Sequence, residues 1–436
     1  MSKRIVITTY GSLGDLYPYL AIALELKARG HQAAIATSEY YRSTIEAEGI
    51  EFYPVQPDLL PDIEENQAIF RRILDVKHGS EYVVRQMLLP HLRKSYDGLK
   101  AAISNADLLL THPLVFAGPL VAETTGIPWV SSVLGPLAFL SAYDPPVLAP
   151  FPSWRYLRPL GPWVNGRLFS LGKQLTRSWS EPVGQFRNEL GLEPGLDHLF
   201  EGQHSPTLIL ALFSQLFAAS QPDWPPQTCV TGFMFCDCLG GTDLSPELSS
   251  FLDDGPAPIV FTLGSSAIFD AGNFYTESAR AAEQLGYRAV LLVGQRNRHL
   301  FSEWQSNRIA VVDYAPHAEL FPRAAAIVHQ GGIGTTAQAL RSGRPMLVVP
   351  FSFDQPDNAA RVTRLGVART LPRHRYTANR VVAELDRLLH DPRYTTRATE
   401  VGHQLQAENG VKMACDAMDA HLQDKRSFFK NLKPIT

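Results

Sequence analysis

The sequence predicts an α/β protein of two doubly wound, Rossmann-like units that face one cleft. Three observations indicate this fold class. Short apolar runs alternate with helical patterns, which is the rhythm of parallel βαβ units. A proline- and glycine-rich stretch over residues 220–258 interrupts the rhythm, which then restarts. The 436 residues are also too many for one compact core.

The first array opens the chain. Leu16–Arg29 has apolar residues at helical spacing, and Gly30 follows as a C-terminal cap. Short continuous apolar runs are typical of buried parallel strands. The strands expected on this basis are Ile5–Thr9, Ala33–Thr37, Asp107–Thr111 and Pro128–Val133. We place this first unit at residues 1–235.

The second array follows the stretch over residues 220–258, which we interpret as a linker. Phe274–Leu285 is expected to be a helix closed by Gly286. The expected strands are Ile259–Leu263, Ala289–Val293, Ala325–Val328 and Met346–Val349. We place this second unit at residues 236–410. The final segment, 411–436, is expected to hold a helix over Val411–Leu422 that could pack back on the first unit.

The composition excludes some functions. The formal net charge is −3 and 19% of residues are charged, so the basic surplus of a nucleic-acid binder is missing. No run approaches the roughly 20 apolar residues of a membrane span, and the first apolar run is too short for a signal peptide. We therefore expect a cytoplasmic protein. The four cysteines, which include Cys236 and Cys238, lack zinc-site spacing, so buried thiols and no metal are expected.

A glycine-rich turn follows the expected strand Ala325–Val328 and leads into a helix. Glycines at such a turn let a phosphate approach the backbone, and a helix start offers N–H groups and the positive end of its dipole. A neighbouring histidine can donate a hydrogen bond to the same phosphate. The residues expected at this phosphate site are His329, Gly331, Gly332, Gly334 and Thr335. The alternative is a loop whose glycines only turn the chain.

A second loop follows the expected strand Met346–Val349 at the same sheet edge. It places Asp354 and Gln355 where ligands bind in doubly wound folds. A carboxylate beside an amide offers acceptors and donors together, which suits sugar hydroxyls. The alternative is that Asp357 or Asn358 caps the following helix.

These motifs together resemble the donor signature of the inverting UDP-glycosyltransferase superfamily, which has the GT-B fold. The signature is His329-x-Gly-Gly-x-Gly-Thr, Gly343-x-Pro345, Pro350-Phe351 and Asp354-Gln355-x-x-Asn358-Ala359. The N-terminal Gly11-Ser12-x-Gly14-Asp15-x-x-Pro18 is similar to the bacterial branch with sterol and antibiotic glycosyltransferases. Asp223-Trp224-Pro225 and Phe261-Thr262-x-Gly264-Ser265 resemble segments of the rhamnosyltransferases of rhamnolipid synthesis.

The resemblance implies a nucleotide-diphosphate sugar as co-substrate in the second unit, with no other cofactor. Carried over by position, the expected donor contacts are Ser265, Tyr314, Ala315, His329, Gly331, Gly332, Gly334, Thr335, Asp354 and Gln355. Tyr314 and Ala315 stand where many members place a base-stacking Trp and a Gln, so uridine and thymidine both remain open. A ribose-binding glutamate is missing, and Gln338 or a neighbour could substitute. UDP-glucose is the first expectation and dTDP-rhamnose the second.

Inverting transfer needs a base for the acceptor hydroxyl. The resemblance implies Asp15 as that base, in the loop where plant-type members have a histidine. The alternative is that Asp15 only caps the helix. His112 follows the expected strand Asp107–Thr111, close to where those members place the partner aspartate. We therefore expect a catalytic pair in which Asp15 takes the place of the histidine and His112 takes the place of the aspartate. The alternative for His112 is a structural histidine before Pro113.

Residues 145–180 hold five basic residues, six aromatic residues and no acidic residue. One interpretation is a cationic, apolar rim that receives a hydrophobic acceptor, extended to peripheral contact with the inner membrane face. The other is a loop and helix that pack on the first unit with solvated charges.

The sequence thus predicts an enzyme, a hexosyltransferase for a hydrophobic small-molecule or lipid acceptor with a hydroxyl group. A nucleotide-sugar epimerase or hydrolase of the same fold would instead turn over donor without acceptor. A non-catalytic homologue would bind the sugar nucleotide only, although His329 and Asp15 are both present. A Rossmann dehydrogenase is disfavoured, because Gly11-Ser12-Leu13-Gly14 is not Gly-x-Gly-x-x-Gly. The acceptor, the regiochemistry and the oligomeric state stay open.

Overall fold

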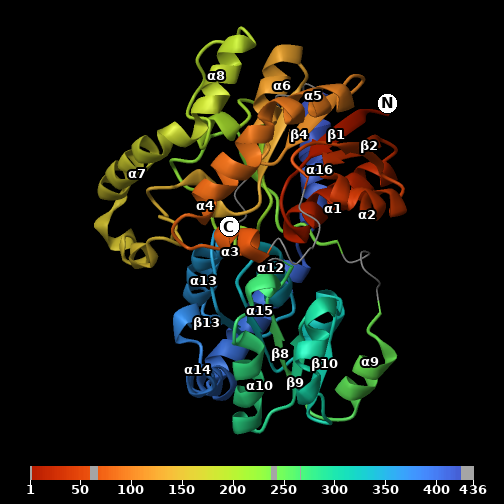
Figure 1. The fold of residues 1–436 in the computed structure, drawn as a ribbon, viewed down its shortest axis with the longest axis vertical. Coiled ribbons are helices and arrows are strands. Elements are labelled where there is room, and N and C mark those ends of the chain that lie inside the picture. Colours follow the sequence, from red (N-terminus) through yellow and green to blue (C-terminus); the bar gives the residue numbers. More distant parts are fainter. Residues whose placement is uncertain (1, 59–66, 237–242, 266, 424–436) are drawn as a thin grey trace.

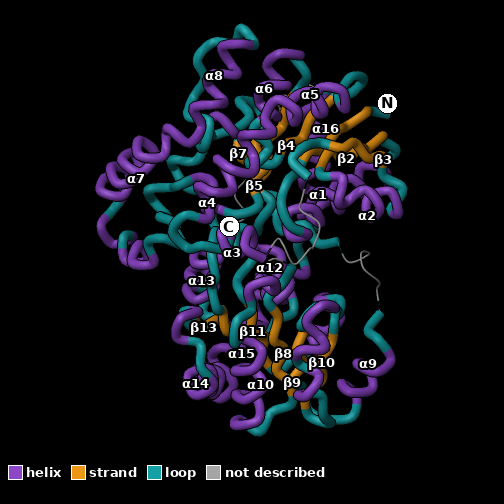
Figure 2. Tube along the Cα trace, in the orientation of Figure 1, coloured by secondary structure: helices purple, strands orange, loops and turns teal. Residues whose placement is uncertain are grey.

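The computed structural model describes residues 2–58, 67–236, 243–265 and 267–423, which form two units, each with one parallel sheet (Figure 1). Helices pack on both faces of each sheet (Figure 2). The expected α/β class with two Rossmann-like units is confirmed. Two expectations concern residues outside the described ranges: the buried thiol of Cys238 and the part of the final segment past residue 423.

The first sheet has the order β3-β2-β1-β4-β5-β6-β7. Its strands are β1 Arg4–Thr8, β2 Gln32–Thr37, β3 Glu51–Pro54, β4 Leu108–Thr111, β5 Trp129–Val133, β6 Ile209–Ala211 and β7 Thr228–Val230. All strands are parallel. From β1 the chain adds β2 and β3 on one side and then β4 to β7 on the other, so the strand order has a switch point between β1 and β4. In doubly wound sheets this switch point is where ligands bind, beyond the carboxyl ends of the strands.

The second sheet has the order β10-β9-β8-β11-β12-β13, with its switch point between β8 and β11. Its strands are β8 Ile259–Thr262, β9 Ala289–Leu292, β10 Ile309–Val312, β11 Ala326–His329, β12 Met346–Val348 and β13 Ala368–Thr370. The central strands β8 and β11 are buried along their whole length, as their continuous apolar runs require.

Sixteen α-helices connect and cover the strands of the described residues. Those before the second sheet are α1 Leu13–Ala28, α2 Arg42–Ala47, α3 Gln67–Ile73, α4 Gly79–Tyr82, α5 Leu92–Ala102, α6 Ala117–Thr125, α7 Pro162–Thr176, α8 Glu181–Glu189 and α9 Pro246–Asp253. The others are α10 Phe274–Leu285, α11 His317–Leu320, α12 Ile333–Arg341, α13 Gln355–Arg364, α14 Ala378–His390, α15 Pro392–Gln406 and α16 Gly410–Leu422. None of these helices is long and apolar enough to cross a membrane.

The last described helix returns to the first unit. α16 packs along α1 and buries Cys415 and Met418 in the same core. Arg29, which follows α1, donates to Asp416 at 2.7 Å and to Asp419 at 3.0 Å. The chain therefore crosses between the two units twice, which restrains how they face each other.

The expectation of a linker over residues 220–258 is wrong for two segments. β7 extends the first sheet at its edge, and α9 is a regular helix. Pro246 does not break α9, because it is the first helical residue after the N-cap Ser245. The N–H at this position has no partner within a helix, so its absence in proline costs no hydrogen bond. The other expected elements are present, with ends that differ by at most three residues.

Candidate active site

Asp15 lies in the first turn of α1, one loop after β1. Its Oδ2 accepts hydrogen bonds from the Ser12 backbone N–H at 2.7 Å and from the Ser12 hydroxyl at 3.2 Å. Ser12 is the N-cap residue, so the two residues form a capping box. Gly11 has φ +138°, and a Cβ there would collide with the carboxylate. Capping thus uses one carboxylate oxygen and leaves Oδ1 for a second partner.

That partner is His112, which follows β4 across the switch point. Its Nε2 lies 3.8 Å from Asp15 Oδ1, slightly beyond hydrogen-bond length. Its Nδ1 accepts from the Leu114 backbone N–H at 3.2 Å, so a neutral ring carries its proton on Nε2. Burial lowers the pKa of His112 to about 3, which keeps the ring neutral. The structure therefore brings the two residues together, with His112 as a neutral donor that faces the carboxylate.

Asp15 remains accessible from the cleft. Its side chain is 29% exposed, whereas that of His112 is 7% exposed. Burial raises the pKa of Asp15 to about 6, and the hydrogen bonds from Ser12 oppose the rise. A carboxylate with an open face and a pKa near neutrality is suited to accept a proton.

His329 ends β11, just before the glycine-rich turn, and is fully buried. Its Nδ1 accepts from the Gly331 N–H at 3.1 Å, and its Nε2 faces the sulfur of Met346 at 3.4 Å. Burial lowers the pKa of His329 to about 3, and His317 nearby adds to the shift. The neutral ring thus fixes the shape of the turn. Its contact with a diphosphate stays a prediction, which requires Nε2 to leave the sulfur.

The glycine-rich turn delivers the start of α12 to the cleft. Gly331 has φ +91° and passes so near Val348 that a Cβ would lie 2.8 Å from a methyl carbon. The N-cap of α12 is Gly332, which has no side chain to cap the helix. A Cβ on Gly334 would lie 3.9 Å from Cα of Gly14 in the first unit. The starts of α1 and α12 therefore face each other.

The loop after β8 lies against this turn. A Cβ on Gly264 would lie 3.4 Å from the hydroxyl of Thr335, which places the half-buried Ser265 near the same helix start. The Gln330 side chain fills the space between Gly264 and Gly332. Its Oε1 is buried and has no hydrogen-bond partner among the described residues. Gln330 is a site residue that the sequence pattern did not single out; its only signal was a polar residue within the glycine turn.

Asp354 immediately precedes α13 in the second unit and lies near Asp15 of the first unit. Asn358 donates to Asp354 Oδ2 at 2.7 Å and to the Gly331 carbonyl at 2.9 Å. Burial raises the pKa of Asp354 to about 7, the Asn358 bond opposes the rise, and the charge of Asp15 adds to it. Neither Asp357 nor Asn358 caps α13, because both side chains bind other groups.

Gln355 stabilises the loop before α13. Its Oε1 accepts from the backbone N–H groups of Phe351 at 2.8 Å and Ser352 at 3.2 Å. The amide nitrogen is then the atom left for a sugar hydroxyl. Phe353 has φ +55°, a strained conformation for a bulky residue that turns Asp354 back toward the cleft.

Tyr314 and Ala315 follow β10 and differ in accessibility. Tyr314 is 53% exposed and lies near Tyr17 of α1, whose pKa is raised to about 12 by burial and then by Tyr314. Ala315 is buried in the core, with 1% of its surface exposed. Tyr314 therefore has the open face that stacking on a nucleobase requires, whereas a donor contact of Ala315 stays a prediction.

A buried ion-pair network, which we call the clamp, joins the units beside this site. Arg361 of α13 is 2% exposed and donates to Asp357 at 2.7 Å and to Asp144 of the first unit. Asp357 also accepts from the backbone N–H of Val147 at 3.0 Å. Burial favours the neutral acid of Asp144, but Arg361 and Arg364 hold its pKa below the usual range. The clamp fixes α13, and with it Asp354 and Gln355, to the first unit.

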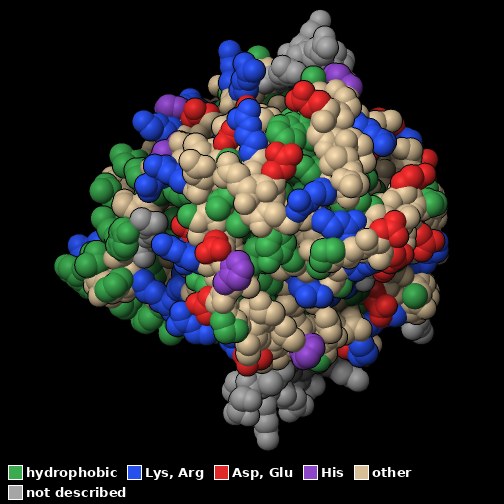
Figure 3. Space-filling view, turned by 90° about the horizontal axis from the view of Figure 1, so that it is seen from below, with side chains coloured by type: hydrophobic (Ala, Val, Ile, Leu, Met, Phe, Trp, Pro, Cys, Tyr) green, Lys and Arg blue, Asp and Glu red, His purple; other side chains and the backbone are tan. Residues whose placement is uncertain are grey.

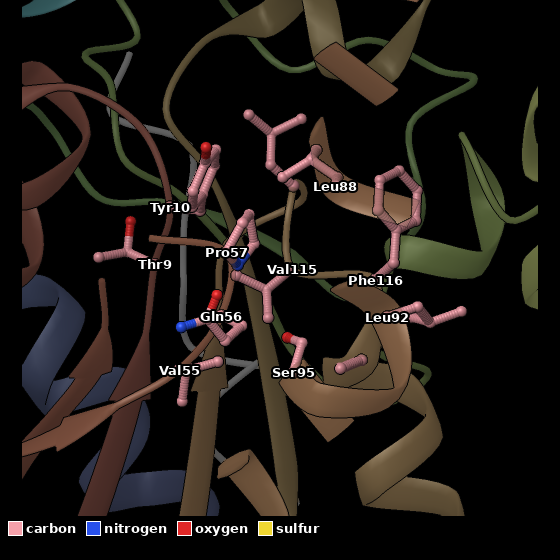
Figure 4. A pocket seen from close by; sticks show the side chains of 12 residues that line it. Thr9, Tyr10, Val55, Gln56, Pro57, Leu88, Leu92, Ser95, Val115 and Phe116 are labelled. Carbon is pink, nitrogen blue, oxygen red and sulfur yellow. The ribbon is translucent and has the colours of Figure 1, made fainter. Parts of the chain in front are cut away.

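A small cavity lies in the first unit, where segments that follow β1 and β4 contribute to its lining (Figure 4). Its volume is about 20 Å³, room for one water molecule. It is lined by Thr9, Tyr10, Val55, Gln56, Pro57, Leu88, Leu92, Ser95, Leu114, Val115, Phe116 and Ala117. The Tyr10 hydroxyl in this mostly apolar wall is buried without a hydrogen-bond partner among the described residues. None of the lining residues belongs to the basic, aromatic stretch 145–180.

Comparison with known proteins identifies both units. Residues 5–143 match the glycosyltransferase family 28 N-terminal domain, and residues 281–412 match the C-terminal domain of erythromycin biosynthesis protein CIII-like proteins. The chain is 32% identical over 425 residues to the O-mycaminosyltylonolide 6-deoxyallosyltransferase of Streptomyces fradiae, covering 94% of this chain and 96% of that protein. It is 28% identical to a sterol 3-beta-glucosyltransferase of Neurospora crassa, covering 97% of this chain and 28% of that protein.

Solved structures share the fold. The glycosyltransferase of kitacinnamycin superposes with a TM-score of 0.74 at 22% identity and covers 97% of this chain and 100% of that one. The glycosyltransferase VinC, solved in complex with dTDP, superposes with a TM-score of 0.66 at 20% identity, covering 96% of this chain and 100% of that one. With two doubly wound units and a relative 32% identical over 96% of its length, the chain belongs to the GT-B glycosyltransferase superfamily.

Proposed function

We propose that this glycosyltransferase moves a hexose from a nucleotide-diphosphate sugar to a hydroxyl of a hydrophobic acceptor, with inversion at the anomeric carbon. The observation that carries the proposal is the opposition of two helix starts. Asp15 lies at the start of α1, and Gly334 at the start of α12 approaches Gly14 beside it. One side offers a base and the other the positive end of a helix dipole.

The proton transfer falls to Asp15. The acceptor oxygen attacks the anomeric carbon, the bond from that carbon to the diphosphate breaks, and the hydroxyl proton passes to Asp15 Oδ1. His112 carries its proton on Nε2 and faces the same oxygen at 3.8 Å, so it donates toward the carboxylate and does not take the proton. The hydrogen bonds from Ser12, which lower the pKa of Asp15, favour the ionised carboxylate before the attack.

The departing diphosphate gains negative charge, and groups of the second unit must stabilise that charge. The N–H groups at the start of α12 and the hydroxyls of Ser265 and Thr335 are the donors nearest the glycine turn. Preorganised donors of this kind stabilise developing charge without reorganisation. The buried amide of Gln330 adds a polar group at the same place.

UDP-glucose is the donor we infer first, and dTDP-rhamnose the second. Asp354 and the amide nitrogen of Gln355 supply an acceptor and a donor, which suits a fully hydroxylated hexose. The exposed ring of Tyr314 can stack on either pyrimidine. The name of one relative supports glucose as the sugar, and the dTDP complex of VinC supports a thymidine nucleotide as the alternative to uridine.

A hydrophobic acceptor is supported by the names of the relatives. The relatives are named for a tylonolide and for sterols, both rigid apolar molecules with hydroxyl groups. We infer an acceptor of that chemical class.

Transfer can be tested directly with UDP-glucose and dTDP-rhamnose, each mixed with a panel of macrolide and sterol acceptors. We expect a product heavier by one sugar from at least one pair, with release of the nucleoside diphosphate. Mass spectrometry of the mixture measures both. If either donor is consumed equally fast without any acceptor, the protein is an epimerase or hydrolase of this fold and the proposal is wrong.

The pH profile should show an acid limb that belongs to Asp15. Because the base must be ionised and burial raises its pKa to about 6, kcat/KM should fall about tenfold per pH unit below about pH 6 and level off above it. The Ser12 hydroxyl lowers that pKa, so Ser12→Ala should raise it and shift the acid limb to higher pH. Initial rates from pH 4.5 to 8 measure the limb; a limb that Ser12→Ala leaves in place would rule out this assignment.

A further inference from the structure

The solvent face of α7 carries large apolar side chains. Trp163, Arg167, Leu171 and Leu175 follow one another at four-residue steps, so they form one ridge along the helix. Trp163 is 73% exposed, Leu175 72% and Leu171 54%. Surface helices of globular domains normally place such residues inward. This ridge, which we call the α7 ridge, is therefore an exception within the molecule.

The inward face of α7 already has its partners. Asn165 and Phe169 are buried, and Asn165 donates to the Ala142 carbonyl at 2.9 Å. Phe169 packs near Trp154. The helix is thus held by one face while the α7 ridge points outward. Figure 1 shows α7 at the outer edge of the first unit, and Figure 3 shows apolar side chains gathered at that edge with Lys and Arg beside them.

The stretch that contains α7 carries basic residues and no acidic ones, and two of its cations are paired with acidic residues from outside the stretch. Residues 145–180 contain five basic residues and no acidic residue, although the whole chain has a formal net charge of −3. Lys173 is neutralised by Glu201, and Arg158 lies 3.8 Å from Asp144. Arg167 lies over the ring of Trp163, 5.2 Å from its centre, and Arg177 is exposed just past the helix end. Exposed cations therefore accompany the exposed rings and leucines.

We propose that the α7 ridge rests on an anionic lipid bilayer. A helix that exposes apolar residues with arginines among them fits the boundary between acyl chains and head groups, where tryptophan also concentrates. The ridge is convex and lies at the edge of the molecule, which suits a soft, flat partner. Tyr156 and Leu160, 65% and 53% exposed, extend the same apolar region before the helix. The arginines would meet lipid phosphates.

This inference goes beyond the proposed function and stands without it, because it concerns only the surface of α7. It also gives the proposed function a route for its acceptor. An apolar acceptor dissolves in a bilayer, so a protein held there by α7 would meet it at high local concentration. The clamp residue Asp144 lies in the loop that leads from the first unit toward α7.

Flotation with lipid vesicles tests the proposal on the full chain. Vesicles of phosphatidylcholine with about one-third phosphatidylglycerol should carry the protein at low salt, and pure phosphatidylcholine vesicles should carry much less. The double substitution Trp163→Ala with Leu175→Ala should weaken binding about tenfold or more. Arg167→Gln should weaken it about fivefold, the effect of one surface cation. Leu300→Ala, at a 58% exposed leucine of the second unit, is the matched control and should change nothing.

A second readout reports insertion of one ring. Binding to anionic vesicles should blue-shift the fluorescence, and Trp163→Phe should remove most of that shift. No retention on anionic vesicles at low salt would overturn the proposal. So would a dimer in solution that the α7 substitutions abolish without any vesicle binding, because the partner would then be a second copy of the chain. Transfer to a water-soluble acceptor is measured separately and should be unaffected by the α7 substitutions.

Discussion

Replacing Asp15 with asparagine should lower kcat by about 100- to 10,000-fold, the range that a positioned general base contributes. The substitution is nearly isosteric, and the asparagine oxygen can still accept the N–H of Ser12 that now binds Oδ2 at 2.7 Å. The start of α1 is thus preserved while the proton acceptor is lost. Steady-state rates with saturating donor and acceptor measure the effect.

Two comparisons separate catalysis from structure in this experiment. The nucleotide affinity of Asp15→Asn should match that of the native protein, because the diphosphate is held by the second unit. His112→Ala should reduce kcat less, by about tenfold, since His112 only stabilises the charged form of Asp15. If Asp15→Asn keeps more than a tenth of the native kcat, Asp15 only caps the helix.

Replacing Arg361 with leucine should lower the free energy of unfolding by about 3 to 5 kcal/mol, the loss expected when one partner of a buried ion pair is removed. Arg361 is 2% exposed and neutralises Asp357 and Asp144, which are 0% and 7% exposed at their side chains. Without the guanidinium, Asp357 loses its buried ion-pair partner, and Asp144 keeps the more distant Arg364 at 3.3 Å and Arg158 at 3.8 Å. Urea denaturation followed by circular dichroism measures the change.

A surface ion pair supplies the matched control. Arg393 donates to Asp391 at 2.6 Å but is 89% exposed, so Arg393→Leu should change stability by less than about 1 kcal/mol. The KM for the donor should also rise in Arg361→Leu, because α13 carries Asp354 and Gln355. Equal stability losses in the two variants would show that the clamp does not hold the units together.

The fold was predictable because its central strands are continuous apolar runs and its helices carry caps. Ile5, Val6 and Ile7 of β1 are all fully buried, and the Gly286 cap of α10 has the left-handed conformation that its position predicts. The strands β3, β6, β10 and β13 were not predicted; β13, for example, has only three residues and includes Arg369 and Thr370, so it lacks the continuous apolar run that marked the short strands β8 and β11. α9 was missed because proline density marks both loops and helix starts.

The site was only partly predictable, because spacing shows which loops meet but not where each side chain points. The sequence brought Asp15 and His112 to one switch point and offered base and helix cap as alternatives for Asp15, but it could not show that the cap uses only one carboxylate oxygen. It also could not show that the His329 nitrogens face Gly331 and Met346. The clamp could not be foreseen either. Asp144 and Arg361 are 217 positions apart, and their pairing depends on how the two units dock.

The anomeric configuration of the transfer product tests the central claim most directly. In UDP-glucose the sugar is α-linked, and a single displacement between Asp15 and the start of α12 inverts that carbon. Proton NMR of the isolated product should therefore show only the β-glycoside, and the same product at a much lower rate from Asp15→Asn. An α-glucoside from UDP-glucose would contradict the account, because retention requires two displacements or attack from the face of the leaving group, and neither is a single displacement with Asp15 as base.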